Sequence, residues 1–455
     1  MTEPLLEGVD AYIASHRDRI LAELFSLIRQ PSVSARGEGM QPCADLLASL
    51  MQASGVESVE QIATAGYPVV YGAVEGLRKD KTLLVYGHYD VQAPEPLDAW
   101  VSPPFEPEIR DGKIYGRGSS DNKAQLFIFL KAVEILRALT GEAPLNMRFL
   151  FEGEEEIGSP NLAGFARANR ARLQADATVF SDGHRHQSGR PTATLGVKGM
   201  LYVELSVDAA GRDHHSMHAT SIPNPVWRLV WALNALRSAS DAINIPGFHA
   251  SVRAPTALEA AAIEGIPEAE SLAAEFGVDA LLPGRVRDGY HWNLITEPTL
   301  NIAGIQGGYS GPGSKTVLPG KASAKLDIRL VPDQKPGEIL EKLRARLDAA
   351  GFADVGIRVL HETVPSRTSM DHPFLAVILD SLRSAYKSEP IVYPSMGGVG
   401  PNYVFTDILG QPCFGVPHAS FDQANHSPNE NMCMTGFING LRSTVLMLSR
   451  AADAL

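Results

Sequence analysis

Three short apolar runs, each followed by histidine or acidic residues, constrain most strongly how this chain of 455 residues folds. The runs cover residues 82–86, 146–151 and 177–180, and longer segments of helical pattern alternate with them. Such alternation is typical of an α/β sheet whose strands are buried and mostly parallel. Because open α/β sheets present ligand groups at the carboxyl ends of their strands, we expect the polar residues after these runs to form a site.

The second half of the chain has a different pattern. Apolar and polar residues alternate over 201–207 and 324–330, which predicts strands with one solvent-exposed face. Helical periodicity appears over 225–237 and 337–350, so we expect a smaller α+β layer here. The stretch 248–298 is rich in Ala and Glu, is broken by Gly and Pro, and is left unassigned.

Charge and cysteine content exclude several classes of protein. The chain has 40 Lys and Arg against 52 Asp and Glu, and the net charge of −12 disfavours nucleic-acid and anionic membrane partners. Its three cysteines are too few for a disulfide scaffold, and no apolar run approaches the roughly 20 residues of a membrane span. Residues 1–29 have the pattern of an acidic amphipathic helix, unlike a signal peptide. We therefore expect a cytoplasmic protein.

The first candidate site residues are His88 and Asp90 in YGHYD, directly after the first run. A histidine two residues from an aspartate is more often structural than metal-binding, so only its position at a strand end favours a function. Asp121 in GRGSSDNK precedes a long helical segment, where a carboxylate commonly caps free backbone N–H groups. Gly116 and Gly118 allow the backbone to fold tightly around a ligand of Asp121, which keeps a binding role open.

Acidic residues crowd together after the second run, in FEGEEEIGS, which contains Glu152, Glu154, Glu155 and Glu156. A run of like charges usually marks a solvated surface. At the exit of a buried strand, however, the mutual repulsion of these carboxylates costs free energy unless a cation or a shared proton relieves it. The crowding therefore favours a metal ligand with a general base beside it.

The third run ends in FSDG, which contains Asp182, and His426 lies far along the chain in NHSPNE. Taken singly, Asp182 is typical of a turn and His426 of a surface loop. Taken together, the candidates supply two histidines and at least three carboxylates, a set of ligands that suits Zn²⁺ or Mn²⁺.

The motifs resemble, in order and spacing, a family of di-zinc metallopeptidases that includes carnosinase-type dipeptidases, aminoacylase, glutamate carboxypeptidase and succinyl-diaminopimelate desuccinylase. The motifs are YGHYDVQ, WVSPPFEPEIRDGKIYGRGSSDNK, FEGEEEIGS, FSDG, GGYSGPGSKTVLPGKASAKLDIRLVP and NHSPNE. They span almost the whole chain, and the middle blocks look most like the dipeptidase branch. The resemblance implies a two-domain α/β metallopeptidase with a mixed, mostly parallel sheet flanked by helices. Its catalytic domain would comprise 1–196 and 394–455, with an inserted α+β lid or dimerisation domain at 197–393.

The resemblance also implies a centre with two divalent metal ions per subunit, Zn²⁺ as the first candidate and Mn²⁺ as the alternative. His88 and Asp182 would hold one metal ion. His426 and Glu156 would hold the other, and Asp121 would bridge the two.

The remaining site residues implied by the resemblance act on water or on substrate. Asp90 would orient His88 by accepting its second N–H, as the partners of ligating histidines do. Glu155 would be the general base, which takes a proton from water and passes it to the leaving amine. His215 would reach the partner subunit's site in a homodimer and stabilise the oxyanion. Residues that bind substrate would be Arg329, Gly397 and Gly398, with the arginine clamping a carboxylate.

The expected activity is that of a metal-dependent exopeptidase that hydrolyses dipeptides. An N-acyl-amino-acid amidohydrolase with the same site is the alternative, so a small peptide or an N-acyl amino acid is the expected substrate. Two departures from the family pattern bear on substrate choice. Val399 stands where many dipeptidases have Ser, and 184–186 carry two histidines and an arginine. These three residues could line the substrate pocket, but we expect an exposed loop.

Overall fold

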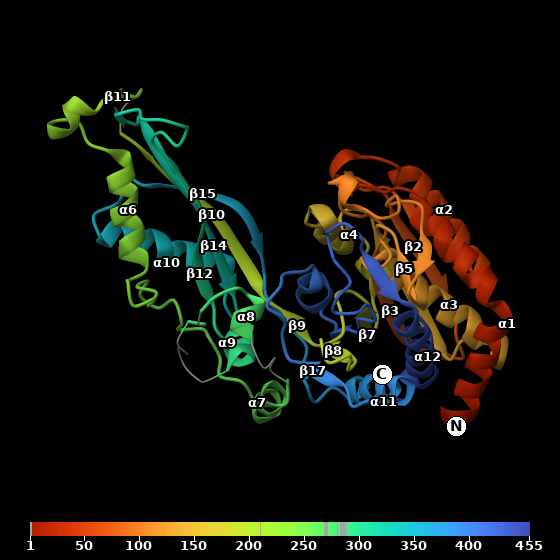
Figure 1. Cartoon of the computed structure of the whole chain (residues 1–455). Helices are drawn as coiled ribbons and strands as arrows, with labels where there is room; N and C mark the ends of the chain where they lie inside the picture. Colours follow the sequence, from red (N-terminus) through yellow and green to blue (C-terminus); the bar gives the residue numbers. More distant parts are fainter. Residues whose placement is uncertain (1, 210, 268–271, 280, 283–288) are drawn as a thin grey trace.

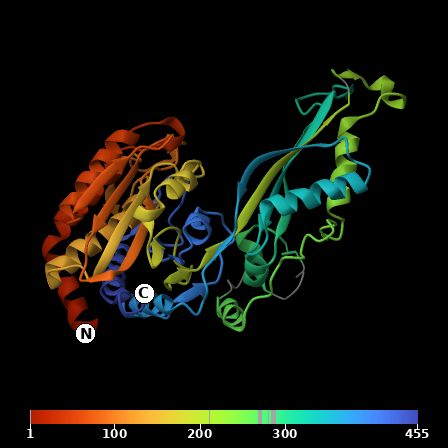
Figure 2. The same ribbon diagram turned by 180° about the vertical axis from the view of Figure 1, so that it is seen from behind.

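The computed structural model describes residues 2–209, 211–267, 272–279, 281–282 and 289–455 of the chain. The chain forms two lobes, and both termini lie in the first of them (Figures 1 and 2). In the part of the chain that the structure describes, no helix has both the length and the hydropathy needed to cross a membrane.

The first lobe is built on a mixed sheet of eight strands. In spatial order the strands are β1 (Ser58–Ile62), β2 (Val69–Val74), β6 (Leu145–Glu152), β3 (Arg78–His88), β7 (Ala177–Phe180), β18 (Cys413–Gly415), β8 (Thr192–Thr194) and β17 (Ile391–Tyr393). β6, β3, β7 and β18 run parallel, whereas β1 and β2 pair antiparallel at one edge. This arrangement confirms the predicted α/β fold and brings the carboxyl ends of β3, β6 and β7 to one edge.

Helices cover both faces of this sheet. One apolar core contains residues of α1 (Thr2–Arg29), α2 (Met40–Ala53), α3 (Lys123–Thr140), α11 (Pro373–Tyr386) and α12 (Met434–Ala451). The core on the other face contains residues of α4 (Leu162–Ala168), α5 (Arg170–Leu173) and the π-helical segment Val404–Leu409. In β3, Leu83 and Val85 contribute to the first core, and Leu84 and Tyr86 to the second. Burial on both faces explains why this strand has an uninterrupted apolar run.

The second lobe has an antiparallel sheet with helices on one face. The strand order is β12 (Thr299–Gly307), β14 (Lys321–Leu330), β10 (Gly199–Asp208) and β15 (Gly356–Thr363). Two helices, α6 (Pro225–Leu236) and α10 (Pro336–Ala349), share one apolar core with these strands. The burial of β10 alternates residue by residue, as its sequence pattern predicts.

The chain passes between the lobes at two adjacent points. β9 (Gly196–Val197) pairs antiparallel with β16 (Ser366–Arg367) there. The expected domain limit at 394 assigns α11 to the second domain, yet this helix packs in the core of the first lobe. The helical period of α11 shows that it has a buried face but not which lobe covers that face.

The stretch left unassigned from the sequence contains three short helices, α7 (Ala257–Glu264), α8 (Leu272–Glu275) and α9 (Tyr290–Thr296). They lie at the end of the second lobe that is nearest to the first lobe (Figure 1). Ile263 of α7 and Ile295 of α9 form a small apolar cluster with Ile391 and Tyr393 of β17. This cluster fixes part of the unassigned stretch against the large sheet.

Candidate metal centre

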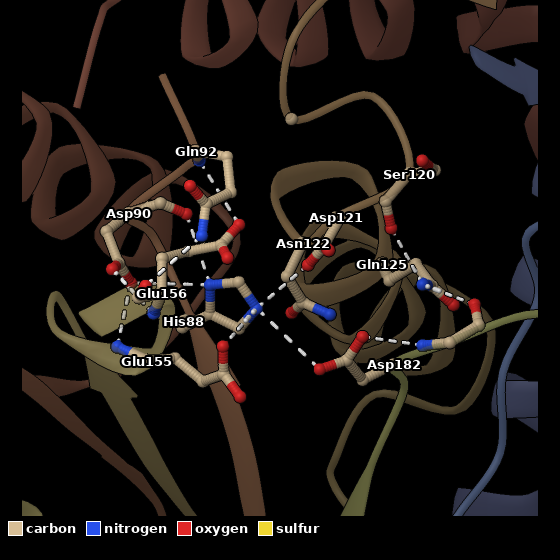
Figure 3. A network of polar contacts seen from close by, with 12 residues as sticks. His88, Asp90, Gln92, Ser120, Asp121, Asn122, Gln125, Glu155, Glu156 and Asp182 are labelled. Atoms are coloured by element: carbon tan, nitrogen blue, oxygen red, sulfur yellow. Dashed lines mark hydrogen bonds and ion pairs between the residues drawn. The ribbon is translucent and has the colours of Figure 1, made fainter. Parts of the chain in front are cut away.

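Ends of neighbouring elements in the first lobe bring the acidic residues and histidines together, as Figure 3 shows for most of them. His88 is the last residue of β3, Asp182 follows β7, and Asp121 lies two residues before α3. Glu155 and Glu156 begin a 3₁₀ turn after β6. The parallel strands therefore deliver the predicted residues to one edge of the sheet.

Two groups of ligand atoms share one carboxylate. His88 Nε2 lies 3.1 Å from Asp121 Oδ1 and 3.7 Å from Asp182 Oδ2. His426 Nε2 lies 3.2 Å from Asp121 Oδ2 and 3.1 Å from Glu156 Oε2. Each group has the spacing needed to hold one metal ion, and Asp121 belongs to both through different oxygens.

The donor atoms fit divalent metal ions. His88 is fully buried, and among the described residues its Nε2 has no hydrogen-bond partner of good geometry. A buried imidazole nitrogen without such a partner costs free energy, which coordination of a metal ion would recover. Imidazole nitrogen with carboxylate oxygen is a ligand set of Zn²⁺ and Mn²⁺.

Asp90 is fully buried and contacts both His88 and the acidic turn that contains Glu155 and Glu156. His88 Nδ1 lies 3.3 Å from its carboxylate and 3.1 Å from its backbone oxygen. The same carboxylate accepts hydrogen bonds from the backbone N–H groups of Glu155 and Glu156, at 3.2 and 3.0 Å. Asp90 therefore fixes the imidazole and the acidic turn relative to each other.

Glu155 is the cluster carboxylate that is paired least closely. Its Oε2 lies 4.0 Å from His88 Nε2, and 23% of its side chain is exposed toward the cavity beside the cluster. Burial raises the pKa of Glu155 well above its ordinary value; the charge of His88 opposes this shift, and the charges of Asp182 and Asp121 add to it. A carboxylate with a raised pKa is suited to accept and release a proton near neutral pH.

Glu430 holds the backbone around Asp121, a role that sequence analysis missed. Its buried carboxylate accepts hydrogen bonds from Ser120 N at 2.8 Å, from Asp121 N at 2.9 Å and from Arg117 Nη1 at 2.7 Å. Glu430 is the last residue of NHSPNE, so the motif that supplies His426 also positions the shared carboxylate. The only sign of this role in the sequence is that Glu430 is an acidic residue within the NHSPNE motif.

A cavity of about 600 Å³ opens beside the cluster. Gly398 and Val399 line it, whereas Gly397 packs against Leu294, whose Cδ1 would lie 2.5 Å from a Cβ atom at position 397. His184 and His186 also line the cavity, and His186 is only 7% exposed. The expectation of an exposed loop at 184–186 was therefore wrong, because the described part of the second lobe covers it through Pro267, whose carbonyl lies 3.2 Å from His186 Nε2.

Two predicted residues of the second lobe lie outside this cavity. His215, in β11 (His214–His215), lies at the far tip of the second lobe, and its Nδ1 accepts a hydrogen bond from Met217 N at 3.1 Å (Figure 1). Arg329 does not line the cavity and instead donates to Asp327, at 3.0 and 3.2 Å. The single chain therefore does not bring His215 or Arg329 to the candidate ligands.

A buried acid beside the cluster predicts how stability depends on pH. Burial raises the pKa of Glu152 to about 7 from 4.5, although Tyr86 Oη and Ser159 Oγ donate hydrogen bonds to it. The folded chain thus holds this proton more tightly than the unfolded chain, and the free energy of unfolding falls as pH rises between these values. From pH 5 to pH 8, we expect the wild type to lose about 2 kcal/mol relative to Glu152→Gln.

Urea denaturation of chelator-treated protein at both pH values measures this difference. Glu142→Gln, a change at an exposed residue, is the control and should follow the wild type. If the wild type and Glu152→Gln lose stability in parallel, burial of Glu152 does not raise its pKa.

The chain is similar to known proteins over most of its length. The model of "Peptidase family M20/M25/M40" matches residues 84–450. The human Beta-Ala-His dipeptidase is 28% identical over 465 residues, covering 96% of this chain and 91% of the relative. The Cys-Gly metallodipeptidase dug1 of Schizosaccharomyces pombe is 29% identical over 388 residues, covering 82% of this chain and 81% of the relative.

Solved structures are similar over nearly the whole length. The M20 family metallo-carboxypeptidase Sso-CP2 from Sulfolobus solfataricus has a TM-score of 0.88 at 34% identity, covering 95% of this chain and 99% of the other. Human carnosine dipeptidase 1 has a TM-score of 0.79 at 26% identity, covering 99% of both chains. The two-lobed architecture is therefore common to this chain and these enzymes.

Proposed function

This chain belongs to peptidase family M20/M25/M40, and from that premise we propose that it is a dipeptidase that works with two divalent metal ions. The family match and the dipeptidase relatives confirm the resemblance and the class of metallopeptidase hydrolase. The observation that carries the proposal is the shared carboxylate of Asp121, whose two oxygens belong to two separate groups of ligand atoms.

In this proposal, each metal ion has three protein ligands. His88, Asp121 and Asp182 hold one ion. Asp121, Glu156 and His426 hold the other, and Zn²⁺ is preferred over Mn²⁺ as the resident ion. Bound divalent cations supply Lewis acidity, which lowers the pKa of water and polarises a substrate carbonyl group.

The protein itself supplies the proton transfers and the orientation. A carboxylate oxygen of Glu155 takes a proton from water and delivers it to the nitrogen of the leaving amine. The Asp90 carboxylate keeps Glu155 in place by accepting a hydrogen bond from the backbone N–H of Glu155. The same carboxylate lies beside His88 Nδ1, which keeps His88 Nε2 directed at the other ligands. The exposure of Glu155 toward the cavity supports this role, because substrate and water reach it there.

We also propose a homodimer, in which His215 acts in the partner subunit's site. Trp227 and Trp231 of α6 stack at 5.9 Å, and both are more than half exposed. β12 is an edge strand, and its Ile302 and Ile305 are exposed too. Exposed apolar groups on a helix and an edge strand favour an interface with a second copy. Light scattering that gives the mass of one chain, for a fully active enzyme, would contradict this proposal.

Three unpaired cysteines support a cytoplasmic location, as the composition predicts. Cell fractionation tests this location, and recovery of the chain outside the cytoplasm would contradict it.

The test of function is mass-spectrometric product analysis of a mixed pool of dipeptides, longer peptides and N-acyl amino acids. We expect amino acids to be released from dipeptides, only after reloading with Zn²⁺ or Mn²⁺ and not in a chelated control. Consumption of N-acyl amino acids alone would assign the rival amidohydrolase activity. Removal of single C-terminal residues from longer peptides would assign a carboxypeptidase activity, the activity after which the Sulfolobus enzyme is named.

A further inference from the structure

Apolar side chains from both lobes line the cavity beside the metal cluster. We call them the apolar wall and define them as Phe180, Phe276, Tyr290, Leu294, Met396 and Val399. The same cavity is lined by three histidines outside the cluster, His184, His186 and His291, and by neutral polar side chains. A substrate held at the cluster therefore has aromatic and aliphatic side chains within the same cavity.

The apolar wall is built by packing between segments far apart in the sequence. The rings of Phe276 and Tyr290 lie 5.8 Å apart, which joins the residue after α8 to the start of α9. Leu294 of α9 in turn packs against Gly397 of the first lobe. The apolar wall is therefore held in part by a contact between α9 and the first lobe.

Outside the metal cluster, the described residues that line the cavity include three histidines but no Lys, Arg, Asp or Glu. Among the described residues that line it, the acids are Asp121, Glu155 and Asp182, and there is no Lys or Arg. A charged substrate side chain directed at the apolar wall would lose water without gaining an ion pair, which costs free energy. An apolar side chain gains free energy in the same place, in proportion to the area it buries.

On the premise of the proposed function, we propose that this enzyme selects substrates with a bulky apolar side chain, aromatic or branched aliphatic, over small or charged ones. The apolar wall determines this selection. Burial of one such side chain corresponds to a gain of roughly 10-fold to 100-fold in kcat/KM over alanine.

The first experiment compares dipeptides that carry Leu, Phe, Ala, Glu or Lys at either position, with alanine as the constant residue. We expect kcat/KM of the metal-loaded enzyme to be at least about 10-fold higher for Leu or Phe than for Ala at one position. Glu and Lys at that position should fall below Ala. Equal or better turnover of the small or charged dipeptides overturns the inference while leaving the proposed function intact.

The second experiment changes the apolar wall with a matched control. Phe276 is 51% exposed, so Phe276→Lys should fold and should place a cation at the wall. We expect the ratio of kcat/KM for Glu to that for Leu to rise about 10-fold or more. Leu258 on α7 is 56% exposed and does not line the cavity, so Leu258→Lys should leave the ratio unchanged. An unchanged ratio in Phe276→Lys, or an equal rise in both variants, overturns the inference.

A binding measurement tests the apolar wall without relying on the proposed dipeptidase activity. Isothermal titration of the wild-type protein with free leucine, alanine and glutamate requires no turnover. Tighter binding of leucine supports the apolar wall even if no dipeptide is cleaved, a result that would contradict only the proposed function. Binding of glutamate or alanine as tight as that of leucine contradicts the inference.

Discussion

Glu155→Gln is expected to lower kcat about 1,000-fold without loss of metal ions, because general acid–base catalysis contributes 10² to 10⁴ to rates. Glutamine has the shape of glutamate but cannot accept the proton. The backbone N–H of residue 155 still donates to Asp90, so the turn should keep its geometry. A general base must be deprotonated to act, which adds a second expectation. In the wild type, kcat/KM should fall at acidic pH as Glu155 becomes protonated, and the variant should lose that acidic limb.

The matched control is the neighbouring carboxylate. Glu154 is buried, accepts hydrogen bonds from Asn161 Nδ2 at 2.9 Å, and does not line the cavity. Glu154→Gln should therefore keep kcat within a few fold of the wild type. Steady-state kinetics gives kcat for both variants, and metal analysis shows whether each variant still binds its metal ions. A kcat within threefold of the wild type in Glu155→Gln, with metal still bound, would remove the general base from the proposal.

Local pattern was sufficient to predict the strand-end residues. His88, Asp182 and the acidic run that contains Glu156 were expected together because they follow apolar runs that were expected to form parallel strands. The choice of Glu156 within that run came from the motif resemblance. The structure brings them to one edge for that reason. His426 was different, because nothing near it in the sequence distinguishes a ligand from a surface histidine. Only the motif resemblance connected it with the others, and contacts across more than 300 residues place it beside Asp121.

The apolar wall was beyond what local pattern can predict. Tyr290 and Leu294 belong to a stretch with no strong period, because α9 is short and packs through few residues. Its place depends on contacts with β17 and with position 397, which are tertiary. For Arg329, local pattern gave an incomplete prediction. Alternation in β14 places Asp327 and Arg329 on the same face, but it does not show whether the two pair or the arginine stays available to a substrate.

Asp121→Ala is expected to abolish binding of both metal ions. Its Oδ1 lies with His88 and Asp182, and its Oδ2 lies with Glu156 and His426, so one substitution removes a ligand from each group. The fold around it should persist, because Glu430 holds the backbone N–H groups of 118, 120 and 121 and not the side chain.

Asp182→Ala provides the contrast, since Asp182 belongs to one group only. After dialysis against buffered Zn²⁺, elemental analysis should find about two equivalents in the wild type and one in Asp182→Ala. Asp121→Ala should retain almost none, and its kcat should fall at least as far as that of Glu155→Gln. Circular dichroism checks that both variants are folded. Two equivalents in a folded Asp121→Ala would contradict the bridge, because the two groups would then bind their ions independently of the carboxylate that they share.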